Sequence, residues 1–162
     1  MDKKKGWLLL LLLLAVVLSG AVTVGAGPID LYPQGLLVLS STLVSFGDLK
    51  SEPFDPPLEY FEAEDALNIH IITLFRDWQL LMSGTDFRSG ADLIPLQQLE
   101  WKKQGDFYKK MKAAGSEEVI AKGEDYPWLP YYLVDLSFRL VLTGNEVPGY
   151  YGNTMTFSMI FP

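Results

Sequence analysis

Large apolar residues alternate with small polar ones near the end of the chain, in the stretch TMTFSMIF at residues 154–161. Successive side chains of a β-strand point to opposite faces, so this pattern predicts a strand with one buried face. Residues 132–142 show the same period, with Leu136 and Phe138 on the apolar face. A turn containing Gly and Pro separates the two stretches, so we expect them to pair as a hairpin.

Further stretches of the chain also favour strands. Ile69 and Ile71 alternate with polar residues over 67–73, and Trp78 begins a second alternating run at 78–82. The link between these two runs is short, which predicts another hairpin. Residues 36–46 and 117–121 are rich in aliphatic residues and are expected to supply additional strands.

Two stretches break the alternation. Residues 48–65 are acidic and contain three prolines, so a long loop is expected there, because proline cannot donate to a strand ladder; a short extended piece around Tyr60 is the one strand-like stretch allowed for. Residues 106–114 carry Phe107, Met111 and Ala114 at helical spacing, which predicts one short helix. The predicted fold class is all-β: an antiparallel immunoglobulin-like β-sandwich with this one helix. Its expected core residues are Ile69, Trp78, Leu136, Phe138 and Phe157.

The first residues of the chain have a different composition from the rest. Three lysines at 3–5 precede an apolar run that begins at Trp7, and small residues including Val24 and Ala26 follow it. This order is typical of a secretory signal peptide, so we expect a signal peptide helix over 1–26 and a single β-sandwich domain over 27–162. The alternative is an uncleaved membrane anchor, which would be the protein's only contact with a membrane.

The charge balance and the lack of cysteine limit which partners and which kinds of site the chain can have. The chain has 13 basic and 20 acidic residues, and removal of residues 1–26 leaves 10 basic and 19 acidic ones, a net charge of −9. Binding to nucleic acid requires clustered Lys and Arg, so this balance argues against a nucleic-acid partner. The chain contains no cysteine, which excludes disulfides, thiolate nucleophiles and cysteine metal sites.

The polar residues predict no catalytic, cofactor or metal site. His70 is the one histidine, and it lies at a polar-face position of its strand. The sequence has no Gly-x-Ser-x-Gly turn that could present a serine nucleophile to this histidine. Acids such as Glu59 and Glu62 could supply a hydrolase pair or calcium ligands, but no arrangement of roles and no calcium-loop pattern accompanies them. A small secreted hydrolase therefore remains the least favoured function.

Aromatic residues are the more informative excess. Tyr126, Trp128 and Tyr131 are close in sequence, and Tyr150 would lie near them across the predicted hairpin. Aromatic rings beside carboxylates are suited to stacking on sugars, so these four residues are the candidate glycan-binding site. The competing interpretation is that they pack at the end of the sandwich, because Tyr and Trp are often half-buried.

Several motifs resemble bacterial surface and pilus-type immunoglobulin-like domains, the group that includes spore-coat U-like domains. They are TLVSFGDL, NIHIITLFRDWQLLM and VPGYYGNTMTFSMIF, and together they follow the expected order over most of the chain after residue 26. The chain departs from that group by lacking cysteine and by the segment around Phe107. The resemblance implies an extracellular structural or adhesive role without catalytic residues.

The leading functional hypothesis is a secreted, non-enzymatic component of the bacterial cell surface or envelope, acting as a subunit of a larger assembly. Its expected partners are other surface proteins or cell-wall glycan, and the first alternative is a carbohydrate-binding module. The closing strand could also mediate self-association, because residues 152–161 carry no charge that would block pairing at a sheet edge.

Overall fold

The computed structural model describes residues 35–54, 57–127 and 129–162. These described residues belong to one compact unit, Pro33–Pro162. The predicted signal peptide lies outside the described residues. No helix within the described part is long and apolar enough to cross a membrane.

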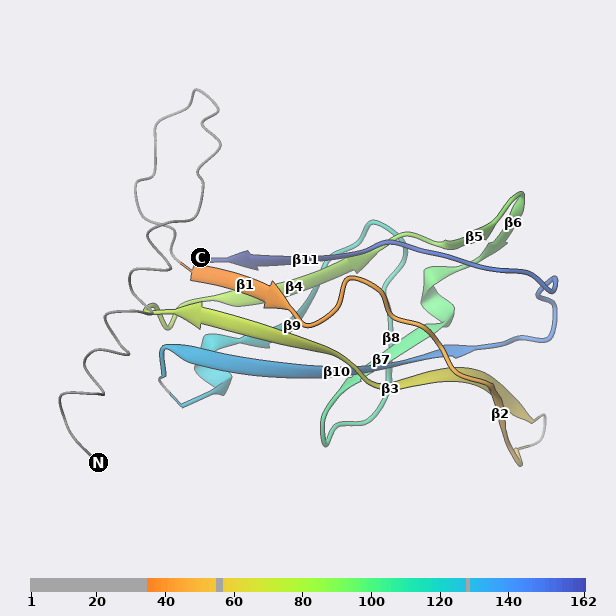
Figure 1. Ribbon diagram of the computed structural model, residues 1–162, viewed down its shortest axis with the longest axis horizontal. Helices are drawn as coiled ribbons and strands as arrows, with labels where there is room; N and C mark the ends of the chain where they lie inside the picture. The colour runs from red at the N-terminus through yellow and green to blue at the C-terminus, as the bar shows by residue number, and fades with distance from the viewer. Residues whose placement is uncertain (1–34, 55–56, 128) are drawn as a thin grey trace, which may run out of the picture. The chain divides into compact units, whose positions relative to one another are not determined.

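The described unit is built of antiparallel strands, which confirms the all-β prediction (Figure 1). The larger sheet has the order β1-β3-β10-β7-β8, and β2 also pairs with β3. The smaller sheet has the order β11-β4-β9, and β5 pairs with β6 in a separate small hairpin. The bounds of the larger sheet's strands are β1 Gly35–Leu39, β2 Leu49–Glu52, β3 Leu58–Thr73, β7 Leu99–Lys103, β8 Lys109–Lys110 and β10 Tyr131–Val141. The remaining strands are β4 Gln79–Gly84, β5 Phe87–Ser89, β6 Asp92–Ile94, β9 Glu118–Lys122 and β11 Met155–Ile160.

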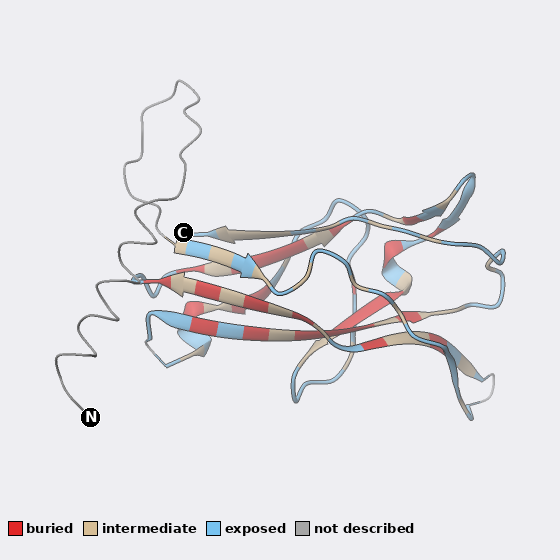
Figure 2. Cartoon of the chain, viewed as in Figure 1, coloured by how far each residue is buried: buried red, intermediate tan, exposed pale blue. Residues whose placement is uncertain are grey.

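Both sheets contribute to one hydrophobic core (Figure 2). Ile69 of β3 and Leu136 of β10 are fully buried from the larger sheet, as are Leu80 and Met82 from the smaller one. The alternating apolar residues of β11 are only half-buried and pack against the edge of this core. Of the expected core residues, Ile69, Trp78, Leu136 and Phe138 are confirmed as buried, whereas Phe157 is half-buried.

Strand β3 carries a bulge where it pairs with β10. Its register against β10 shifts between the Leu136–Leu67 and Phe138–Ala63 pairs, so β3 holds extra residues at this point. Asp65 lies in the bulge with a φ of 45°, a left-handed conformation that Asp adopts more readily than most residues. Its backbone N–H donates to Ser137 Oγ at 3.0 Å, which replaces the interrupted ladder bond.

The predicted partners of two strands are wrong. Strand β11 pairs with β4 of the smaller sheet and not with residues 132–142, although those residues do form β10 as predicted. Strands β3 and β4 are likewise no hairpin, because they belong to different sheets. The physical reason is that β1 and β10 already occupy both edges of β3 over residues 69–72, so the chain after Thr73 must cross to the other sheet.

Two local predictions are also wrong. Residues 48–65 are not one long loop, because β2 and the start of β3 pair there, with Pro53 near the turn between them. The extended piece expected around Tyr60 is confirmed as part of β3. Residues 106–114 form no helix, because Lys109 and Lys110 form β8 against β7 and the Met111 N–H donates to the Leu99 carbonyl at 2.8 Å. Helical structure in the described part is limited to the short 3-10 turns at Leu96–Gln98 and Gly123–Asp125.

Candidate functional site

Charged side chains form a row across the outer face of the larger sheet. Arg139 of β10 lies in register between Glu62 of β3 and Glu100 of β7, and Glu100 in turn faces Lys110 of β8. Arg139 Nε donates to Glu100 Oε2 at 2.7 Å, and both side chains are largely shielded from solvent. Opposite charges therefore alternate along a line of four strands, which is the stabilising order for cross-strand pairs.

Two tyrosine rings enclose the guanidinium group of this row. The Arg139 guanidinium carbon lies 4.4 Å from the centre of the Tyr108 ring and 5.3 Å from that of Tyr60. Tyr108 belongs to the segment between β7 and β8, and its ring also lies 4.5 Å from Lys102 Nζ. The faces of the two rings attract the positive charge of the guanidinium group and shield it from solvent. Arg139 is therefore held as a fixed structural charge.

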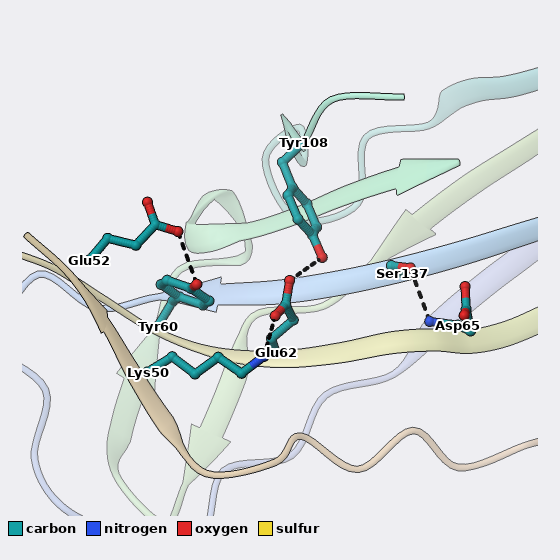
Figure 3. A network of polar contacts seen from close by, with 7 residues as sticks. All are labelled: Lys50, Glu52, Tyr60, Glu62, Asp65, Tyr108 and Ser137. Atoms are coloured by element: carbon teal, nitrogen blue, oxygen red, sulfur yellow. Dashed lines mark hydrogen bonds and ion pairs between the residues drawn. The ribbon is translucent and has the colours of Figure 1, made fainter. Parts of the chain in front are cut away.

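The hydroxyl groups of the same tyrosines bond carboxylates (Figure 3). Tyr108 donates to Glu62 Oε1 at 2.8 Å, and Lys50 Nζ donates to Glu62 Oε2 at 2.6 Å. Tyr60 donates to Glu52 Oε1 at 2.9 Å. We call Lys50, Glu52, Tyr60, Glu62, Glu100, Tyr108 and Arg139 the charged face.

On the charged face, the pKa values of Glu62 and Tyr108 are shifted in the directions that keep the hydrogen bond between them. Burial alone would raise the pKa of Glu62, but the hydrogen bonds from Lys50 and Tyr108 outweigh it and lower that pKa below its ordinary value. Burial and the bond to Glu62 raise the pKa of Tyr108 well above its ordinary range. Glu62 therefore stays ionised and Tyr108 stays protonated near neutral pH, so neither is poised as a proton donor or acceptor for catalysis.

A second feature is a shallow hollow at one side of β10. It has a volume of about 280 Å³, and its lining includes Lys103, Gln104, Asp106, Asp125, Tyr126 and Asp135. Burial, with the nearby Asp125, raises the pKa of Tyr126, so its hydroxyl remains a hydrogen-bond donor. No group of three or more ligating side chains in the described part is placed to hold a metal ion.

The structure separates the aromatic residues proposed to bind glycan. Tyr126 is half-buried and stacks on Trp78 with ring centres 6.0 Å apart. Tyr131 points to the outer face of the larger sheet, where its hydroxyl lies 2.7 Å from His70 Nδ1. Tyr150 is fully exposed in the connection between β10 and β11, at the opposite end of β10 from Tyr131. Trp128 lies outside the described residues.

The predicted acidic residues belong to β3 and not to a ligand-binding loop. Glu62 is occupied by two donors, and Glu59, Glu64 and Asp65 are exposed along the strand. Sequence reasoning missed the charged face because its members come from three stretches that are far apart in sequence, residues 50–62, 100–108 and 139. The one usable signal was the position of Arg139 on the polar side of an alternating strand, which says nothing about its neighbours.

Comparison of the chain with family models, with curated proteins and with solved structures finds no match.

Proposed function

We propose that the chain is an exported, non-enzymatic component of the bacterial cell surface or envelope, built on an immunoglobulin-like β-sandwich. Two antiparallel sheets that share one core support the sandwich type. The signal-like residues 1–26 and the resemblance to spore-coat U-like domains support export and a surface role. The charged face supports a structural role, because its acids and bases neutralise one another within the sheet.

The observation that carries the proposal is the position of β11. It is an edge strand of the smaller sheet and pairs only with β4 among the described strands. The edge strands β2, β8 and β9 each carry Lys or Glu, charges that normally prevent edge-to-edge pairing. β11 and β1 carry none. A strand edge without charged residues is suited to pairing with a strand of another subunit.

The uncharged strands β1 and β11 come close to each other at one point. A Cβ atom added to Gly35 at the start of β1 would lie 2.6 Å from Met159 Cε of β11. The two uncharged edges therefore belong to the same side of the unit. We infer that an added strand docks along β11 and that another copy of the chain supplies it.

Sedimentation velocity tests this assembly. The protein without residues 1–26 is compared with a variant carrying Thr156→Lys and Ser158→Lys on β11. A control carries Ser51→Lys on β2 and Gln97→Lys, both exposed in the structure, which makes the same charge change elsewhere. The wild type and the control are expected to sediment as oligomers and the β11 variant as a monomer. Sedimentation of all three as one species would contradict the proposal.

A second candidate function is carbohydrate binding at the hollow beside Tyr126. The observation that favours it is a tyrosine placed among Asp106, Asp125 and Asp135, the combination of ring and carboxylates that suits a sugar. A glycan array with the wild type, Tyr126→Ala and Tyr150→Ala tests this function. Binding that is lost in Tyr126→Ala, while Tyr150→Ala binds as the wild type does, would support the hollow as the site.

A further inference from the structure

Large apolar side chains are exposed together at the end of the unit where β1 begins. Leu36 is 45% exposed, Leu74 72%, Phe75 51%, Leu129 55% and Tyr131 46%. We call these five residues the apolar end. Monomeric proteins rarely leave several such side chains uncovered in one place, so a surface of this kind indicates a binding site.

The strand register shows that these residues are neighbours. Leu36 of β1 and Tyr131 of β10 both pair with Ile72 of β3, so they lie on either side of it on one face. The Thr73 N–H donates to the Pro130 carbonyl at 3.1 Å, which brings Leu74 and Leu129 to the same edge. In Figure 1 the start of β1 and the end of β3 lie at one end of the unit.

The next row of residues on the outer face of the larger sheet extends this apolar surface. Val38 and Leu133 both pair with His70 and are 43% and 41% exposed. The polar groups within this surface satisfy each other, because the Tyr131 hydroxyl and His70 Nδ1 lie 2.7 Å apart. Exposed and half-buried positions alternate along β1 in Figure 2, so the face is open to solvent in the described part.

We propose that the apolar end rests on a lipid bilayer. The apolar run that we expect to enter the export membrane ends near Val24 in the sequence, and β1 begins at Gly35. Eleven peptide steps span at most about 40 Å, so the start of β1 is the described segment that follows this run most closely along the chain. Tyr and Phe beside aliphatic residues suit the membrane interface. The negative net charge of the chain favours a zwitterionic lipid surface over an anionic one.

The absence of cysteine makes a direct test simple. The full chain is reconstituted into phosphatidylcholine vesicles with a single Leu74→Cys, labelled with a polarity-sensitive dye. The control carries a single Tyr150→Cys, because Tyr150 is also exposed but lies at the other end of β10. We expect the dye at residue 74 to emit at shorter wavelength than the dye at residue 150 and to be quenched by spin-labelled lipid.

A further variant separates docking from local misfolding. The label is moved to Leu129→Cys, and Leu74→Ser and Phe75→Ser are introduced together. Loss of these apolar groups is expected to weaken docking about tenfold and to return the emission toward that in water. Equal, water-like emission at residues 74 and 150 would overturn the proposal. Blue-shifted emission at residue 74 that ignores the lipid quencher and rises with protein concentration would also overturn it, in favour of contact with a second copy.

Discussion

The Tyr108 hydroxyl donates a hydrogen bond to Glu62 at 2.8 Å and thereby ties the segment between β7 and β8 to the outer face of β3. The two residues are far apart in sequence, and strand β10 separates their strands in the sheet. The Tyr108 ring covers Arg139, whose register partners are Glu62 on β3 and Glu100 on β7. One side chain thus connects the segment after β7 to β3 through a hydrogen bond and to β10 through a ring contact.

Tyr108→Phe removes only the hydroxyl group and should lower the free energy of unfolding by about 1 kcal/mol, the usual net value of one hydrogen bond. The ring contact with Arg139 remains, so a larger loss is not expected. Urea unfolding followed by tryptophan fluorescence measures the change. Tyr150→Phe is the matched control, because Tyr150 is fully exposed and should be neutral. Equal stability of the two variants would show that the bond to Glu62 contributes nothing.

The lowered pKa of Glu146 predicts how the free energy of unfolding depends on pH. Burial alone would raise its pKa, but bonds from the Thr143 hydroxyl, backbone N–H groups and Gln98 outweigh this and lower the pKa to about 2. A depressed folded-state pKa gives stability that is present above the unfolded value of about 4.3 and is lost as pH falls toward 2. The urea midpoint of the wild type should therefore drop between pH 5 and pH 2.

Two variants isolate this contribution. Glu146→Gln cannot ionise, so its urea midpoint should be lower than that of the wild type at pH 6 and should approach it at pH 2. Glu117→Gln is the control, because Glu117 is exposed and only its backbone carbonyl accepts a bond, from Lys112. If Glu146→Gln and the wild type lose the same stability over this range, the titration belongs to other carboxylates.

The alternation of side chains was enough to predict the strands but not their partners. Residues 132–142 and 117–121 became β10 and β9 much as expected, because a two-residue period is a local property of the chain. Pairing is set by which edges remain free once β1 and β10 flank β3, and that depends on contacts between distant segments. The length and composition of a short link such as residues 74–78 do not show whether it closes a hairpin or crosses between sheets.

The candidate sites were harder to predict for the same reason. The helical spacing of Phe107, Met111 and Ala114 was misleading, because Met111 is buried beside β7 whereas Phe107 is 90% exposed. Tyr108 therefore faces the sheet from a segment that was expected to be helical. Tyr150 was expected near Tyr131, but it follows the opposite end of β10. Even the predicted hairpin would have placed Tyr150 beside the turn, at that same end of the strand.

The β3 bulge gives a third prediction. Ser137→Ala should destabilise the fold by about 1 to 3 kcal/mol, because the Asp65 N–H loses its acceptor at a point where no strand bond replaces it. Asp65→Gly should be tolerated, since glycine adopts the positive φ without strain. Asp65→Val should be destabilising, because a β-branched side chain is disfavoured there. Thermal unfolding of the three variants tests the order, and a stable Asp65→Val protein would show that the bulge is not rigid.

Among the described glycines, Gly123 leaves the least room for a side chain, at the point where the chain after β9 passes the link between β3 and β4. A Cβ atom at this position would overlap the Arg76 carbonyl oxygen, and it would lie 2.6 Å from Trp78 Nε1. The Gly123 N–H also donates to the Trp78 carbonyl at 2.9 Å, so the two segments cannot separate without losing that bond.

Gly123→Ala should therefore destabilise the protein by about 1 to 3 kcal/mol, the usual cost of forcing an extra group into a packed site. It should also change the fluorescence of Trp78, whose indole would have to move. Gly152→Ala is the matched control, because nothing lies within 4 Å of a Cβ atom there and its backbone is not in the left-handed region. Urea unfolding at one pH compares the two variants. If Gly123→Ala unfolds at the same urea concentration as Gly152→Ala, the segments at Arg76 and Gly123 are not packed as tightly as this structure has them.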